Sequence, residues 1–259
     1  MSQSESSKFS EFMKQLGHAP LAALLLDYDG TLAPFQADRF HAFPYPGMIP
    51  LLESIAVSGG TRLVVISGRP VAELKSLLAP LRAEMWGAAG LERVMPDGSC
   101  GQQPIDSKAA ALLSEAREKI EQAGLVSMAE MKPGGIAMHW RGLPASNAES
   151  AASLIRELWK PFANAPLLRL LEFDQGVELR VTRPDKGDAV RTIVEEVGIE
   201  AQIAYLGDDF TDEDAFRALN RRGLSVLVRP EYRQTLAQAW LRPPEEVIAF
   251  LERWLRQRS

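Results

Sequence analysis

The sequence predicts an α/β protein in which an α+β segment is inserted into a core built on a parallel sheet. Three short, mainly apolar runs lie at residues 24–26, 62–66 and 203–206. Each is followed by glycine or polar residues. Such runs are typical of strands buried on both faces of a parallel sheet. Between the second and third runs, a helix followed by two strands occurs twice. Paired hairpin strands disfavour the alternative of one continuous parallel sheet.

The first part of the predicted core alternates helices and strands. A helix at 9–16 precedes the first strand, and the Ser-rich residues 1–8 predict a frayed lead-in. Helix 70–81 follows the second strand, and a short strand covers 85–87. Residues 90–98 predict a hairpin, because Asp97-Gly98 is a favoured hairpin turn.

The predicted insert begins with an amphipathic helix at 107–122, which Gly124 ends. Strands at 125–132 and 135–141 flank the Pro133-Gly134 turn. The order then repeats with a helix at 147–162 and strands at 167–173 and 177–182. We therefore predict a core of residues 1–103 and 183–259, and a lid, or cap, of residues 104–182.

After the insert the predicted core resumes. Helices are expected at 185–197 and 212–219, followed by a strand at 224–228. The last helix is expected at 243–257, because prolines stand at its start and Glu245 and Glu246 lie in its first turn. Both features favour a helix N-terminus.

Composition excludes several classes of protein. The chain has 259 residues, of which 46% are apolar and 24% charged, as in ordinary globular enzymes. A net charge of −5 argues against nucleic-acid or anionic-membrane partners. Cys100 is the single cysteine, so no internal disulfide forms. The early apolar run 21–26 is too short to span a bilayer, and the first residues lack the layout of a secretory signal. A cytoplasmic location is the expectation.

Chemically useful side chains follow the predicted strands. Asp27 and Asp29 follow the first strand, Ser67 follows the second, and Asp208 follows the third. Lys186 stands near the start of the helix after the insert. Ligand sites in open α/β sheets lie beyond the carboxyl ends of the strands. We therefore expect these side chains to gather at one edge of the sheet, where they suit phosphoryl transfer.

The four segments resemble the motifs of the haloacid dehalogenase-like (HAD) hydrolase superfamily. Its motifs are DxDGT, S/T, K and GDDxxD, matched here from Asp27, at Ser67, at Lys186 and from Gly207. The resemblance implies a Rossmann-like HAD core and an aspartyl-phosphate mechanism. Asp27 would be the nucleophile and Asp29 the general acid and base. Ser67 and Lys186 would stabilise the phosphoryl oxygens.

A divalent cation is expected at the same site. Closely spaced carboxylates repel each other unless a cation compensates them, and Mg²⁺ prefers oxygen ligands. By resemblance its ligands are the side chains of Asp27 and Asp208 and the backbone carbonyl of Asp29. Asp209 and Asp212 are expected to orient water and Lys186 from outside the ligand set.

The insert resembles that of one branch of the superfamily, the trehalose-6-phosphate phosphatases. That branch carries ExK, LHYR and E-x-R patterns, matched here at 130–132, 138–141 and 178–180. Its LDYDGTL, ISGR and GDDxTDEDAF wording appears at 26–32, 66–69 and 207–216. The resemblance implies that Glu130, Lys132 and Glu178 hold the distal glucose, since charged groups bind sugar hydroxyls strongly. The predicted substrate-binding residues are Gly68, Arg69, Glu130, Lys132, His139, Arg141, Glu178 and Arg180.

The sequence thus predicts a Mg²⁺-dependent sugar-phosphate phosphatase whose partner is a small molecule. The expected reaction releases trehalose and phosphate from trehalose 6-phosphate. One departure bears on the substrate: Ala89 stands where the branch usually has His. Two alternatives stay open, a phosphatase for glucosyl- or mannosyl-3-phosphoglycerate and a non-catalytic sugar-phosphate sensor. The complete set of catalytic residue types disfavours the sensor.

Overall fold

The computed structural model describes residues 3–36, 38–173 and 175–259. It divides into two compact units, unit 1 from Met1–Gln102 with Asp185–Ser259, and unit 2 from Gln103–Pro184. The predicted insert, 104–182, lies within unit 2. Within the described ranges, no helix combines the length and apolar character that a membrane crossing requires.

Unit 1 contains an eight-stranded sheet with the order β12-β11-β10-β1-β2-β3-β4-β5. All pairings from β12 to β3 are parallel, and β4 and β5 add an antiparallel edge. The predicted α/β class with a mostly parallel sheet is therefore confirmed. The strands are β1 (Ala22–Leu26), β2 (Thr61–Ile66), β3 (Glu84–Gly87), β4 (Glu92–Val94), β5 (Cys100–Gln102), β10 (Gln202–Gly207), β11 (Leu224–Val228) and β12 (Ala239–Leu241).

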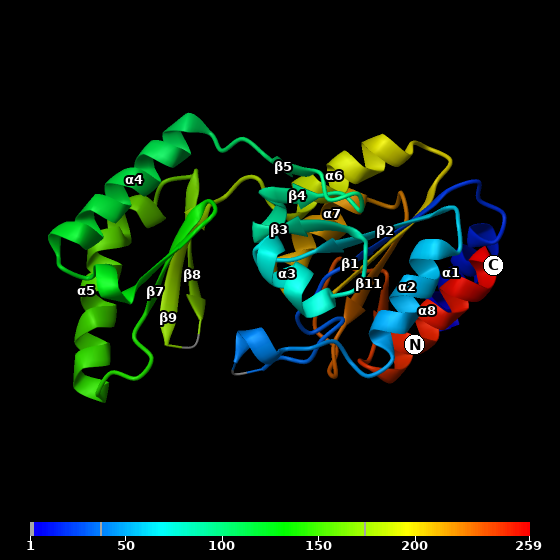
Figure 1. Cartoon of the computed structure of the whole chain (residues 1–259), viewed down its shortest axis with the longest axis horizontal. Helices are drawn as coiled ribbons and strands as arrows, with labels where there is room; N and C mark the ends of the chain where they lie inside the picture. Colours follow the sequence, from blue (N-terminus) through cyan, green and yellow to red (C-terminus); the bar gives the residue numbers. More distant parts are fainter. Residues whose placement is uncertain (1–2, 37, 174) are drawn as a thin grey trace. The chain divides into compact units, whose positions relative to one another are not determined.

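Helices cover both faces of this sheet (Figure 1). Leu24 and Leu26 of β1 pack in one apolar cluster, while Ala23 and Leu25 pack in the other. This double burial explains the continuous apolar run. The first cluster includes residues of α1 (Gln3–Leu16), α2 (Met48–Val57), α3 (Val71–Leu78) and α8 (Glu245–Arg258), and the second includes residues of α6 (Lys186–Val197) and α7 (Asp212–Leu219).

Several details differ from the sequence prediction. In unit 2 the strand predicted at 125–132 begins only at Ala129, because Val126–Met128 forms a 3-10 helix. Helix α1 begins at Gln3 rather than at residue 9, so the frayed lead-in is wrong for residues 3–8. Once a helix is nucleated, each further residue adds a hydrogen bond at little cost. Helix α2 was not predicted, since its sequence MIPLLESIAV is apolar on most sides and contains a proline. That proline lies in the first turn, where it is tolerated. Strand β12 is only three residues long and was also missed.

Unit 2 is a four-stranded antiparallel sheet covered by two helices. The strand order is β6-β7-β9-β8, and helices α4 and α5 pack on the sheet. The repeated order of helix, strand and strand is confirmed. The elements are α4 (Ser107–Gln122), β6 (Ala129–Lys132), β7 (Gly135–His139), α5 (Ala145–Ala163), β8 (Leu168–Phe173) and β9 (Gly176–Val181).

The two faces of this sheet differ in chemistry. Ile136 pairs with Leu179, and Met138 pairs with Val177, so these side chains share one face, and all four are buried. The alternate residues of the same strands point to the other face, because side chains alternate along a strand. That second face carries the charged residues of unit 2 described below, and we call it the polar face.

Candidate active site

Three neighbouring strands bring the predicted catalytic residues to one edge of the unit 1 sheet. Leu26 of β1 is in register with Val65 of β2 and with Leu206 of β10. The backbone N–H of Asp27 donates to the Leu206 carbonyl at 2.8 Å, which extends the ladder by one step. Asp27, Ser67 and Asp208 each follow the end of one of these strands.

Lys186 joins this group from the first turn of α6. The Asp185 side chain caps the helix by accepting from the Asp188 N–H, and the Asp188 carboxylate accepts from the Asp185 N–H in return. The Lys186 Nζ donates to Asp27 Oδ1 at 2.7 Å and to Asp212 Oδ1 at 2.8 Å. Burial acts to lower the pKa of Lys186, but the Asp212 and Asp27 charges outweigh it and raise that pKa above its usual value. Lys186 therefore stays protonated.

Asp212 is fully buried and uses both of its carboxylate oxygens within the protein. Its Oδ1 also accepts from the Tyr205 hydroxyl at 2.6 Å. Its Oδ2 accepts from the backbone N–H groups of Asp208 and Asp209 at 3.0 and 2.9 Å. These bonds fix the Lys186 ammonium and the turn that carries Asp208. They suit a supporting residue, while the Asp209 side chain is exposed to solvent.

Asp27 and Asp208 are buried carboxylates in a strongly acidic neighbourhood. Burial raises the pKa of Asp27 to about 7, with Asp212 and Asp29 adding to the rise and Lys186 opposing it. Burial and the charges of Asp27 and Asp212 raise the pKa of Asp208 to about 9. Carboxylates in such surroundings remain ionised at neutral pH only when further positive charge is supplied.

This arrangement fits a magnesium ion. Carboxylate oxygens of Asp27, Asp208 and Asp212 lie within 4.8 Å of one another. Among the described residues, no side chain or backbone donor bonds to the Asp208 carboxylate, although Asp208 is only 3% exposed. A buried carboxylate with free lone pairs, beside a second carboxylate, suits a hard cation. Asp27 and Asp208 could therefore hold the ion.

Asp29 and Arg69 form a two-pronged ion pair beside this cluster. The Arg69 Nε and Nη2 donate to Asp29 Oδ2 and Oδ1 at 2.7 and 2.6 Å. The Arg69 Nη1 donates to the Arg39 carbonyl at 2.6 Å, and the guanidinium lies over the Tyr28 ring. Arg69 was predicted to bind substrate, and the structure places its guanidinium against Asp29. Gly68, beside it, faces open space.

Ser67 is almost fully buried and lies against a left-handed loop. Its N–H donates to the Trp86 carbonyl, and its carbonyl accepts from the Ala89 N–H, both at 2.8 Å. Ala88 and Ala89 have φ angles of 47° and 55°, which cost energy in a residue with a Cβ. The Ala89 methyl is 2% exposed, so a buried apolar group stands where the related branch usually has His.

The polar face of unit 2 gathers most of the other predicted substrate-binding residues. Glu130, Ala137 and Glu178 are in register across β6, β7 and β9, and so are Lys132, Gly135 and Arg180. Residues in register point to the same side of a sheet. Ala137 and Gly135 are small, so the middle of the face is not filled by bulky side chains. A Cβ added at Gly135 would lie 3.1 Å from the Arg180 Cβ, a tight contact that would require a small shift of the neighbouring side chain.

Ion pairs cross the polar face. The Lys132 Nζ donates to Glu178 Oε2 at 3.2 Å, and the His139 Nε2 lies 2.9 Å from Glu130 Oε2. His139 lies two residues after Ala137 in β7, so its side chain points to the same face. Arg180 is 7% exposed. Arg141 is exposed and follows β7 outside the strand, so of the predicted set on this unit it alone lies off the sheet.

Sequence reasoning missed several residues of these two sites. Tyr205 lies inside an apolar strand and looked like core, although its hydroxyl binds Asp212. Arg233 donates to the Asp209 carbonyl at 2.8 Å and Arg229 to the Asp208 carbonyl at 3.3 Å, from a loop with no strand or helix pattern. Arg169 of β8 is in register with Arg180 and therefore belongs to the polar face. Arg169 lies between two leucines in β8, and this charged residue within an apolar strand is a signal that sequence reasoning could have used.

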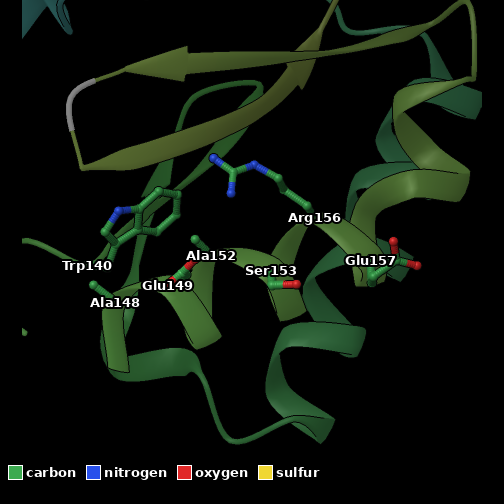
Figure 2. Close-up of a pocket in the computed structure, with 7 residues that line it drawn as sticks. All are labelled: Trp140, Ala148, Glu149, Ala152, Ser153, Arg156 and Glu157. Atoms are coloured by element: carbon green, nitrogen blue, oxygen red, sulfur yellow. The ribbon is translucent and has the colours of Figure 1, made fainter. Parts of the chain in front are cut away.

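A separate cavity of about 480 Å³ lies on unit 2 beside α5 (Figure 2). No predicted site residue lines it. Arg156, which points across it, forms an ion pair with Glu172 at 2.8 Å, and its guanidinium lies 5.5 Å from the Trp140 ring centroid. The lining residues are Trp140, Ala148, Glu149, Ala152, Ser153, Arg156 and Glu157.

Comparison with known proteins identifies one family. The family model described as "Trehalose-phosphatase" matches residues 25–239. A probable trehalose-phosphate phosphatase H of Arabidopsis thaliana is 29% identical over 97% of this chain and 77% of its own length. A trehalose-phosphate phosphatase of Mycobacterium marinum is 28% identical over 93% of this chain, which spans 63% of that protein.

Solved structures show the same fold. The C-terminal domain of a C. albicans trehalose-6-phosphate phosphatase superposes with a TM-score of 0.73 at 21% identity, covering 96% of both chains. An Aspergillus fumigatus trehalose-6-phosphate phosphatase gives a TM-score of 0.69 at 25% identity, covering 96% of this chain and 97% of the other.

Proposed function

We propose that this chain, which belongs to the trehalose-phosphatase family, hydrolyses trehalose 6-phosphate to trehalose and phosphate. The buried cluster of Asp27, Lys186, Asp208 and Asp212 carries the proposal. It combines a nucleophilic carboxylate, a fixed ammonium group and oxygen ligands for a cation. These are the parts that phosphoryl transfer through an aspartyl-phosphate requires.

The first half-reaction transfers the phosphoryl group to Asp27. A carboxylate oxygen of Asp27 forms a bond to phosphorus, and the bond between phosphorus and the sugar oxygen breaks. Asp29 in its protonated form gives its proton to that sugar oxygen, so trehalose leaves as a neutral alcohol. Lys186 holds the nucleophile in place and offsets negative charge on the phosphoryl oxygens, while the Ser67 hydroxyl donates to one of them.

The second half-reaction restores the carboxylate. A water molecule gives a proton to Asp29 and attacks phosphorus, the bond between phosphorus and Asp27 breaks, and phosphate leaves. Each carboxylate oxygen has more than one lone pair. Asp29 can therefore accept this proton while Arg69 still holds its carboxylate. Arg69 thus keeps the base in a defined position.

A magnesium ion would be held by the side chains of Asp27 and Asp208 with the backbone carbonyl of Asp29. When bound, it would offset the negative charge of the phosphoryl group and of the two buried carboxylates. The Asp208 carboxylate is available for it, because Asp212 and the two arginines bind the backbone groups of this turn instead.

The polar face of unit 2 is proposed to bind the sugar hydroxyls. Glu130, Lys132 and Glu178 present acceptors and donors on one side of a rigid sheet, and charged groups discriminate strongly among hydroxyl patterns. The paired charges hold each side chain in position before substrate arrives, which reduces the cost of ordering them on binding. On this proposal unit 2 acts as the lid. Predictions from composition also stay open: a cytoplasmic location, and no nucleic-acid or membrane partner.

One observation favours a second candidate. The polar face carries Lys132, Arg169 and Arg180 against Glu130 and Glu178, a surplus of positive charge. Such a surplus could accept a carboxylate. A phosphatase for glucosyl- or mannosyl-3-phosphoglycerate therefore stays the second candidate.

Phosphate release from a substrate panel tests the proposal. Purified protein with Mg²⁺ is given trehalose 6-phosphate, glucosyl-3-phosphoglycerate, glucose 6-phosphate and methyl phosphate, and kcat/KM is compared. We expect the highest value for trehalose 6-phosphate. A higher value for the phosphoglycerate compound would replace the substrate but keep the mechanism. No release from any compound would favour the sensor.

A further inference from the structure

The exposed aromatic side chains of unit 1 are concentrated beside the catalytic strands. Among the described residues, every large aromatic side chain that is mostly solvent-accessible lies in the segments 35–43 or 210–232. The residues are Phe35, Phe40, Phe43, Phe210 and Tyr232. The residues of segment 35–43 follow β1 and Phe210 follows β10, the strands that lead into Asp27 and Asp208, whereas Tyr232 follows β11. Of the five, Phe35 and Phe210 are nearest in sequence to the catalytic carboxylates, and exposed apolar groups beside a site are candidates for contact with its ligand.

Phe35 lies next to the catalytic carboxylates. Gly30 has a φ of 80°, and a Cβ added to it would lie 2.3 Å from Asp208 Oδ2 and 2.9 Å from Phe35 Cε2. The ring edge and the carboxylate thus approach the same point. Although Phe35 is this close to the reaction centre, 70% of its surface is exposed. One side of the ring is therefore available to a molecule whose phosphate lies at Asp27 and Asp208.

Phe210 lies two residues beyond Asp208, in a turn that Arg233 holds. The Arg233 guanidinium lies 4.5 Å from the centroid of its ring and also donates to the Asp209 carbonyl at 2.8 Å. Arg233 in turn forms an ion pair with Glu213. The loop and one face of the ring are therefore fixed, yet Phe210 is 71% exposed.

We propose that Phe35 and Phe210 bind the sugar ring directly attached to the phosphate, by stacking against its C–H faces. This inference rests on the proposed function. A pyranose ring presents apolar C–H groups on its two faces, and flat aromatic rings bury such surface at little cost in side-chain entropy. The phosphate position limits where that sugar lies, because in a 6-phosphate the ring atom C5 is only three bonds from phosphorus. Phe35 and Phe210 would supply apolar contact to that ring.

Both rings should contribute to the preference for a sugar phosphate over a small phosphate ester. Phe35→Ala and Phe210→Ala should each lower the ratio of kcat/KM on trehalose 6-phosphate to kcat/KM on methyl phosphate by about 10-fold, the usual size of one lost apolar contact. Methyl phosphate reaches Asp27 but has no ring to stack. Phe35→Trp keeps a flat ring and should preserve the ratio better than Phe35→Leu, which keeps only apolar volume.

Phe43→Ala is the matched control. It removes the same side chain from the same exposed segment. The Phe43 ring meets the His41 ring edge-on, with 6.0 Å between the ring centroids, and the Phe43 N–H donates to the His41 carbonyl. The ratio should stay within about twofold of the unmodified protein, as for an ordinary surface substitution. An equal fall of this ratio in Phe43→Ala and Phe35→Ala would overturn the inference. A nonspecific effect of losing exposed apolar surface would then explain both results.

Binding is measured separately from turnover, by calorimetric titration of trehalose 6-phosphate into the Asp27→Asn variant with and without Phe35→Ala. The second substitution should weaken binding by about 10-fold. Unchanged binding together with an unchanged ratio would overturn the stacking role. If the unmodified protein hydrolyses another sugar phosphate instead, the proposed substrate fails, and the same ratio on that compound still decides the stacking role. A change of oligomeric mass in Phe35→Ala with no change in the ratio would identify a protein contact and overturn the inference.

Discussion

Acidic residues are used in opposite ways in the two units. In unit 1, Asp27 and Asp208 are buried close together, and burial raises the pKa of both. In unit 2, Glu130 and Glu178 lie on an accessible sheet face, and each pairs with a basic side chain. The first arrangement is unfavourable without a cation, so it suits metal-assisted chemistry. In the second, each acid already has a basic neighbour, which suits recognition. We therefore predict that substitutions in unit 1 and in unit 2 separate catalysis from substrate choice.

The largest expected effect removes the chemistry from unit 1. Asp27→Asn should lower kcat on every phosphate ester by ~10³-fold or more, because the nucleophile is lost. The amide keeps nearly the same shape, so the thermal transition should stay cooperative. Activity is measured by phosphate release and folding by circular dichroism. Retention of more than a few per cent of activity on any ester would rule out the aspartyl-phosphate route.

The second effect should be confined to the sugar substrate. Lys132→Ala, Glu130→Ala and Glu178→Ala are each expected to lower kcat/KM on trehalose 6-phosphate by roughly 10- to 1000-fold. The kcat/KM on methyl phosphate should fall far less, since this compound has no sugar hydroxyls. Because Lys132 and Glu178 form a pair, the double variant should lose less than the two single losses combined.

Glu172→Ala provides the control for the polar face. Glu172 lies on the same sheet but is in register with buried Val177, and it pairs with Arg156 on the side covered by α5. Its removal should change kcat/KM on neither substrate by more than about twofold. Equal losses on sugar and methyl phosphate in Lys132→Ala would show that the polar face supports folding rather than recognition.

A third effect concerns the pair formed by Asp29 and Arg69. Arg69→Gln keeps length and polarity but removes the charge and the fixed fork, so Asp29 loses its defined position. We expect a fall in kcat of roughly 10- to 100-fold, in the range of misplaced acid–base catalysis, with a smaller change in KM. The fall should be larger for sugar esters than for an aryl phosphate, whose leaving group needs no proton. A rise in KM alone would assign Arg69 to substrate binding, as the sequence prediction had it.

The smallest effect is on stability, and it has a definite sign. Folding raises the pKa of Asp27 to about 7 and the pKa of Asp208 to about 9. At pH values above the usual carboxyl pKa, the folded state therefore binds more protons than the unfolded state. When EDTA removes divalent cations, the free energy of unfolding should therefore fall as the pH rises from about 4 to 9. Mg²⁺ at about 100 times its Kd should restore about 2.7 kcal/mol, or roughly 5–10 °C in Tm.

This stabilisation should depend on unit 1 alone. The Tm increase should be larger at pH 8 than at pH 5, where protons compete for the carboxylates. Asp208→Asn should abolish it, whereas Glu178→Ala should leave it intact. Scanning calorimetry with and without EDTA measures both. An equal Mg²⁺ response in Asp208→Asn would place the cation elsewhere.

The part of the site that the sequence predicted is the part written in short motifs at strand ends. Asp27, Ser67 and Asp208 could be placed together because parallel strands end at a common edge, and the register of β2, β1 and β10 confirms that they do. Lys186 was added by family resemblance, and its bonds to Asp27 and Asp212 place it in the same cluster. The repeated helix–strand–strand pattern likewise predicted the sheet of unit 2.

The missing part consists of contacts between side chains far apart in the sequence. Nothing near Asp29 indicates that Arg69, 40 residues later, holds both of its oxygens. Tyr205 reads as a core residue because its ring is apolar and only its hydroxyl is functional. Arg233 lies in an irregular loop, where periodicity predicts no direction for a side chain. These positions depend on packing that local pattern does not encode.

The position of the insert also affects the order in which the protein can assemble during synthesis. Unit 2 is one continuous stretch, Gln103–Pro184, whereas unit 1 is made from both sides of it. Lys186 is separated from Asp27 by 159 residues, and β10, which covers one edge of β1, comes later still. On a ribosome, β1 and β2 would emerge with an unpaired edge while the whole of unit 2 is being translated. Unpaired strand edges are prone to aggregate, so this interval is when a nascent chain most needs chaperones.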